Sequence, residues 1–73
     1  MVQFQGPFAA NEKIISSTTE ISHLGIEASF GDIVVINGEE IQLCYRGILE
    51  LENISVNSLY FKNDVNYAMI TYN

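Results

Sequence analysis

The stretch Asp-Ile-Val-Val-Ile-Asn-Gly-Glu-Glu-Ile-Gln-Leu, residues 32–43, decides the fold. Two apolar runs rich in β-branched residues flank the pair Asn37-Gly38. A two-residue type I′ turn requires a positive φ at both central positions, which Asn tolerates and Gly adopts freely. The stretch therefore predicts a β-hairpin with arms at 32–36 and 40–45, and it indicates a protein built from short strands.

The first arm of this hairpin is apolar on both of its faces. Ile33 and Val35 share one face, and Val34 and Ile36 share the other, because side chains alternate along a strand. Such a strand is typical of a sheet that is covered on both sides. We therefore expect this arm to be buried.

Further extended segments follow on both sides of the hairpin. The expected strands lie at 13–21, 48–51, 55–61 and 65–72. Gly25 argues against a helix in 22–28, and Glu52-Asn53 is expected to turn the chain. Short strands separated by turn signals every 8–12 residues or so are typical of small sandwiches and barrels. We expect an all-β fold, a small sandwich or barrel of about six or seven short antiparallel strands.

The chain divides into an N-terminal arm, residues 1–12, and a single β domain, residues 13–73. The arm is weakly patterned, and Gly6-Pro7 breaks it. Two interpretations of the arm stay open. Phe4-Gln5-Gly6-Pro7 resembles the site of a viral 3C-type protease used to remove purification tags, which makes the arm partly foreign. Alternatively, the arm is native and is ordered by a partner.

A domain of 73 residues buries only about 60% of its unfolded surface, so its stability is marginal. Domains of this size usually add disulfides, a metal or self-association. The single cysteine, Cys44, cannot form an internal disulfide, and Cys44 and His23 are too few ligands for a zinc site. No cofactor or metal is expected. With 48% hydrophobic and only 16% charged residues, the composition favours self-association.

The formal net charge of −6 bears on the partners. Nucleic-acid binding requires Lys and Arg to neutralise phosphates. Lys13, Arg46 and Lys62 are the only cations and are scattered, so neither nucleic acid nor an anionic membrane surface is expected as a partner. The first residues show no basic segment or apolar core of a signal peptide.

His23, the one histidine, would have to serve any nucleophilic site. The candidate nucleophiles are Cys44, Ser16, Ser17 and Ser22, and no nucleophile-elbow motif surrounds any of them. We interpret His23 as a loop or interface residue. Cys44 is expected to be buried as a small hydrophobe.

Paired carboxylates occur twice in the sequence. Glu39-Glu40 follows the hairpin turn, and Glu50 and Glu52 share one strand face. Like charges side by side can raise one pKa, as glycosidase chemistry requires. Solvation of the strand face is the interpretation we prefer. A weak cation site that joins Glu50 and Glu52 to Asp64 is also conceivable, although it lacks the ligand density of a calcium loop.

Tyrosine is the one enrichment that suggests recognition, since its rigid ring and polar tip suit interfaces as well as strands. We predict a set of core-or-interface residues drawn from the aromatic and Met positions of the second half. The set is Tyr45, Tyr60, Phe61, Tyr67, Met69 and Tyr72. No catalytic residue is predicted.

A series of short motifs resembles a known family. The motifs are Leu-Gly-Ile-Glu-Ala at 24–28, Gly-Asp-Ile-Val-Val-Ile-Asn-Gly at 31–38, Ile-Gln-Leu at 41–43, Arg-Gly-Ile-Leu-Glu-Leu at 46–51, Ile54, and Ser-Leu-Tyr-Phe at 58–61. In this order they resemble a small β domain found in structural proteins of tailed phages of Gram-positive bacteria. The resemblance covers most of the chain, between residues 21 and 72.

This resemblance implies a non-enzymatic virion component of the tail, the baseplate or a head fibre. Its partners would be copies of itself and other virion proteins, and it would be assembled in the host bacterial cytoplasm. A trimer is the first expectation, because phage fibres and spikes are commonly trimeric. The resemblance supplies no catalytic residue.

Two alternatives stay open beside this one. The charge of −6 suits a monomeric acidic protein-binding module, such as a phage-encoded inhibitor of a host protein that mimics nucleic acid. The pair Glu50 and Glu52 would suit a hydrolase or carbohydrate-active domain.

Overall fold

The structure, a computed structural model, describes residues 1–44 and 47–73. It consists of β-strands joined by turns and loops, as the sequence predicts. The strands are β1 (Val2–Gln5), β2 (Thr19–Glu27), β3 (Ile33–Ile36), β4 (Glu39–Gln42), β5 (Ile48–Val56), β6 (Leu59–Phe61) and β7 (Met69–Tyr72). The expected all-β class with short antiparallel strands is confirmed. The described residues contain no helix that could cross a membrane.

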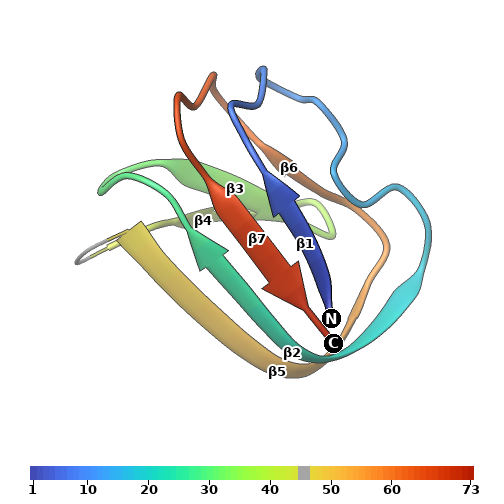
Figure 1. Cartoon of the computed structure of the whole chain (residues 1–73). Coiled ribbons are helices and arrows are strands. Elements are labelled where there is room, and N and C mark those ends of the chain that lie inside the picture. The colour runs from blue at the N-terminus through green and yellow to red at the C-terminus, as the bar shows by residue number, and fades with distance from the viewer. Residues whose placement is uncertain (45–46) are drawn as a thin grey trace.

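The strands form two antiparallel sheets that pack as a small sandwich. The larger sheet has the order β1-β7-β2-β5, and the smaller has the order β4-β3-β6. In Figure 1 the smaller sheet lies behind the larger one, and β1 and β5 border the larger sheet on opposite sides. Isolated bridges at Phe8–Val65 and Ile15–Leu59 supplement the pairing within the sheets.

The hairpin forms at the predicted place. Asn37 and Gly38 have φ values of 53° and 82°, and Ile36 pairs with Glu39 directly across the turn. Val34 is fully buried in the core, and Val35 on the opposite face is also buried, as expected for an arm covered on both sides.

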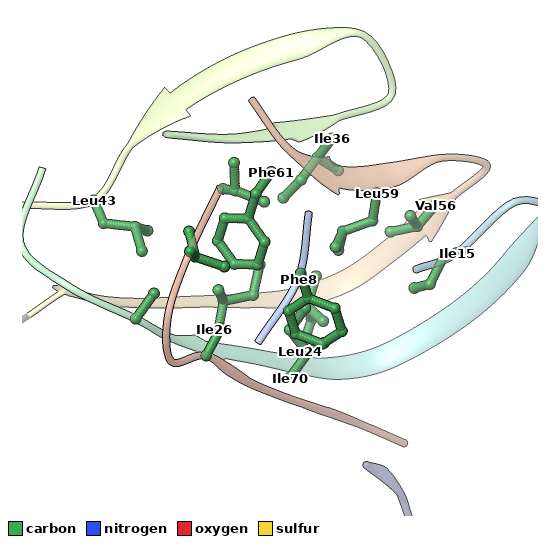
Figure 2. Close-up of a cluster of buried hydrophobic side chains, with 14 of the residues drawn as sticks. Phe8, Ile15, Leu24, Ile26, Ile36, Leu43, Val56, Leu59, Phe61 and Ile70 are labelled. Carbon is green, nitrogen blue, oxygen red and sulfur yellow. The ribbon is translucent and has the colours of Figure 1, made fainter. Parts of the chain in front are cut away.

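The core fills the space between the two sheets with aliphatic and aromatic side chains (Figure 2). Phe61 stands near its centre and stacks on Phe8, with ring centroids 6.0 Å apart. No polar or charged side chain is buried in the described part of the chain. The core therefore depends on apolar packing, in which each buried large side chain contributes about 1.5–3 kcal/mol.

The N-terminal segment is integrated into the fold of its own chain. β1 pairs with β7 along its whole length, and Phe8 enters the core. The strand expected at 13–21 begins only at Thr19, because the chain before it follows β6 instead. There, Asn11 donates a backbone hydrogen bond to Phe61, and Leu59 donates one to Ile15.

β5 runs through the predicted turn at Glu52-Asn53 as a continuous strand. Asn53 has a φ of 52°, a left-handed conformation that Asn tolerates within a strand. The core-facing positions change parity there: Leu49 and Leu51 precede Asn53, and Ile54 and Val56 follow it. At Asn53 the alternation of core-facing positions therefore shifts by one residue, and β5 is paired with β2 on both sides of it.

The last two expected strands are shorter than predicted. The segment 55–61 is divided by a turn at Asn57-Ser58 between β5 and β6. In the segment 65–72 only Met69–Tyr72 is strand. Before it, Val65 forms an isolated bridge with Phe8, and the Ala68 carbonyl accepts a hydrogen bond from Gly6.

Candidate interaction surface

The most distinctive feature of the protein surface is the set of strand edges that no neighbouring strand covers. The outer edge of β6 is covered by its own chain, through the hydrogen bonds of residues 11–15. β1, β4 and β5 each pair with one strand only among the described residues. Unpaired strand edges expose backbone N–H and C=O groups, and natural proteins normally protect them with charges, bulges or proline.

β4 is protected on both of its faces. Glu39 lies on the core-facing side, opposite Ile36, and Glu40 lies on the outer side, opposite Val35. The Lys62 ammonium lies 3.1 Å from the Glu40 carboxylate and pairs with it. A strand added to this edge would have to place its own apolar side chains over the carboxylate of Glu39.

β5 carries its charges on one face only. Glu50 and Glu52 are exposed on the outer face, and Leu49 and Leu51 are half-buried on the core-facing side. Ile48, at the start of the strand, is 47% exposed. The edge of β5 is therefore acidic outside and apolar inside.

β1 carries no charge at all. Its sequence is Val-Gln-Phe-Gln, with Val2 40% exposed and Phe4 half-buried against Tyr72, ring centroids 6.4 Å apart. It also lacks a proline and a bulge. Among the free edges of the described chain, β1 is the one without protection. Its alternation of apolar and amide residues was the available sequence signal, and our division of the chain at residue 12 missed it.

A shallow depression of about 270 Å³ lies on the outer face of the larger sheet. It forms above Gly25, which has no side chain, between the polar His23 and Glu50 and the apolar Ile48 and Met69. The depression is open, and charged and apolar groups are mixed around it. It provides a surface for contact, and it does not enclose a small ligand.

Tyr67 and Glu27 join at the rim of this face. The Tyr67 hydroxyl donates a hydrogen bond of 3.1 Å to the Glu27 carboxylate. This hydrogen bond, together with desolvation and the nearby negative charge, raises the pKa of Tyr67 above its ordinary value. The pair holds the loop before β7 against β2.

The predicted core-or-interface residues do not gather in one patch. Phe61 is fully buried in the core. Tyr60 lies on the smaller sheet opposite Val35, whereas Tyr67 and Met69 lie on or beside the larger one. Tyr72 packs on the core beside Phe4. Tyr45 lies outside the described residues.

The groups that could carry chemistry lie apart or in solvent. The Nδ1 atom of His23 is 3.9 Å from the Glu52 carboxylate, and the His23 side chain is 43% exposed and the Glu52 side chain 74% exposed. Asp64 accepts a hydrogen bond of 2.7 Å from the backbone of Ala10. Within residues 1–44 and 47–73, no cluster of three or more His, Cys, Asp or Glu side chains could hold a metal ion.

The prediction that Cys44 is buried is wrong. β4 ends at Gln42, and the chain leaves the sheet with Leu43 in the core and Cys44 exposed. The thiol lies 3.6 Å from the Gln42 carbonyl oxygen. The alternation of the strand continues to Leu43, which takes the buried position that we assigned to its neighbour.

Comparisons with family models, with curated proteins and with solved structures found no match to this chain.

Proposed function

We propose that this protein is a non-enzymatic structural module that acts by self-assembly, as a component of a phage tail, baseplate or head fibre. The observation that supports it best is the uncharged free edge of β1. An unprotected edge on so small a domain exposes backbone hydrogen-bonding groups that a second chain can pair. The motif resemblance described above supports the virion context.

The composition of the surface also supports assembly. Phe4, Leu49 and Leu51 remain only partly covered at the two borders of the larger sheet. A copy that added to either border would cover them, and each 100 Å² of apolar surface removed from water contributes about 2.5 kcal/mol. The acidic face would keep the assembled particle in solution.

Light scattering across a dilution series tests self-assembly. We expect a mass that is a multiple of 8.2 kDa at micromolar concentration, with three chains as the first expectation. A mass of one chain throughout the series would refute self-assembly. Mass spectrometry of particles purified from a phage that encodes the chain tests the virion context separately.

A monomeric acidic binding module is the second candidate. Glu27, Glu50 and Glu52 share the outer face of the larger sheet, a face without lysine among the described residues. Under this alternative the protein is a single chain in solution and captures a basic host protein. Glu50→Gln with Glu52→Gln would abolish that capture, whereas no such capture is expected of the self-assembling module.

A further inference from the structure

The two borders of the larger sheet differ in charge, and this difference favours pairing of one border with the other over pairing of β5 with itself. From this difference we infer that β1 of one copy adds to the free edge of β5 of the next, antiparallel and head to tail. This inference rests on the self-assembly proposed above and names the surfaces that carry it.

The backbone of β1 has hydrogen-bonding groups available for this pairing. Gly6 donates to the Ala68 carbonyl in the register of the β1–β7 ladder, so Val2 and Phe4 direct their backbone groups at β7. The intervening residues, Gln3 and Gln5, therefore direct their N–H and C=O groups at the free edge.

The backbone of β5 is arranged in the complementary way. Ala28 donates to the Gly47 carbonyl in the register of the β2–β5 ladder, so Leu49 and Leu51 bond toward β2. Glu50 and Glu52 then direct their backbone groups outward.

The direction of the strands fits as well. Neighbours in the order β1-β7-β2-β5 are antiparallel throughout, so β1 and β5 run in opposite directions. A second copy in the same orientation would add its β1 antiparallel to β5 and continue the sheet. Such an interface is heterologous, and it generates a ring when the rotation between copies closes.

The side chains favour one register. With Gln3 of the second copy opposite Glu52 and its Gln5 opposite Glu50, each amide can donate a hydrogen bond to a carboxylate. The same register puts Phe4 of the second copy over Leu51 on the apolar side. The half-buried residues of the two borders would then cover each other.

Charge disfavours pairing of β5 with itself. A two-fold pairing centred on Leu51 places Glu50 opposite Glu52 of the other copy, and it does so twice. Centring on Glu50 or Glu52 brings identical carboxylates together. Like charges directly opposite on paired strands are destabilising. β1 carries no charge, so its addition to β5 brings no like charges together.

The edge of β4 is a poorer receptor for β1. Glu39 lies on its core-facing side, so Val2 or Phe4 of an added strand would cover a carboxylate. Inward-pointing charges of this kind protect edges from added strands. On β5 the corresponding side is lined by Leu49 and Leu51.

Disulfide trapping tests the pairing. Cys44→Ser removes the exposed thiol, and Gln3→Cys and Glu52→Cys are then introduced into separate chains. Within one chain these positions are three strand spacings apart, about 14 Å, and cannot form a disulfide. We expect mixed chains to form the 3–52 heterodimer under mild oxidation. Each variant alone should stay uncross-linked.

Several outcomes would overturn the pairing. Cross-linking of Gln3→Cys chains alone would indicate β1 paired with β1, and cross-linking of Glu52→Cys chains alone would indicate β5 paired with β5. Equal trapping of Gln3→Cys with Glu39→Cys would point to β4 or to random collision. Trapping with Glu50→Cys in place of Glu52→Cys would overturn the register.

Proline scanning supplies a second, independent measurement. Gln3→Pro removes an N–H that faces the free edge, and proline is tolerated at such edge positions. We expect a mass of about one chain for Gln3→Pro. Gln3→Ala keeps the backbone N–H and loses only the side-chain amide, so it should still assemble but dissociate at a higher protein concentration than the wild type, with the same circular dichroism in both variants. A multimeric wild type that neither traps at 3–52 nor responds to Gln3→Pro would refute the edge pairing and leave self-assembly standing. A monomeric wild type would refute both.

Discussion

The side-chain oxygen of Asn37 accepts a hydrogen bond of 2.8 Å from the backbone N–H of Asn57. Asn37 lies between β3 and β4, and Asn57 lies between β5 and β6. The amide nitrogen of the same side chain donates to the Ser55 carbonyl at 2.9 Å. The backbone N–H of Asn37 also donates to Ser58. The residue that makes the β3–β4 turn thus also ties that turn to the β5–β6 turn.

Removal of the Asn37 side chain should therefore destabilise the protein without disturbing the hairpin. Glycine adopts the φ of 53° freely, so Asn37→Gly keeps the turn and loses only the side-chain bonds. We expect a loss of about 1–3 kcal/mol in the free energy of unfolding, measured by urea denaturation. Asn11→Gly is the matched control, because Asn11 has a similar φ of 64°. Equal losses for the two variants would contradict the cross-turn role.

Gly47 and Gly25 should respond very differently to a methyl group. Gly47 has a φ of 64°, and a Cβ there would collide with the Ala28 carbonyl. At Gly25 a Cβ would lie 3.2 Å from the Thr71 hydroxyl, which can rotate away. We expect Gly47→Ala to cost about 3 kcal/mol or more and Gly25→Ala less than about 1 kcal/mol, from thermal unfolding. A stable Gly47→Ala protein would show that this loop adjusts.

The pair of Tyr67 and Glu27 should be visible in an alkaline titration. Since the hydrogen bond raises the pKa of Tyr67, its phenol should stay protonated to a higher pH than that of an unfolded tyrosine. The stabilisation from this pair is fully present below the unfolded pKa and is lost as the pH rises through the folded pKa. Phenolate absorbance, with Tyr67→Phe to assign the signal, measures the shift. Glu27→Gln should lower the pKa, and no change in that variant would argue against the hydrogen bond.

A comparison of Phe8 with Phe30 tests whether the N-terminal segment contributes to the core. Phe8 is buried and stacks on Phe61, whereas Phe30 is 77% exposed. We expect Phe8→Ala to cost about 3–5 kcal/mol and Phe30→Ala to stay within about 0.5 kcal/mol. Phe8→Leu, which leaves a smaller cavity, keeps the comparison measurable if the alanine variant does not fold. Similar effects at both positions would mean that residues before Thr19 contribute little to the core.

The sequence by itself determined the class of the fold and the place of the hairpin. Asn37-Gly38 selects its turn through backbone sterics within two residues, and such local preferences need no other part of the chain. The apolar arm before the turn likewise predicts its own burial. The wrong predictions arise because these preferences are local. They could not show that the second arm of the hairpin buries Leu43 and not the neighbouring Cys44, or that β5 continues through Asn53.

Only the tertiary structure decided which strand edges remain free. β1 is placed by β7, more than 60 residues later in the chain, and β6 is covered by residues 11–15. The glutamates of β4 and β5 protect strand edges only because this arrangement leaves those edges without a neighbouring strand. Pairing between distant segments depends on the packing of the whole core, and no local pattern of residues contains it.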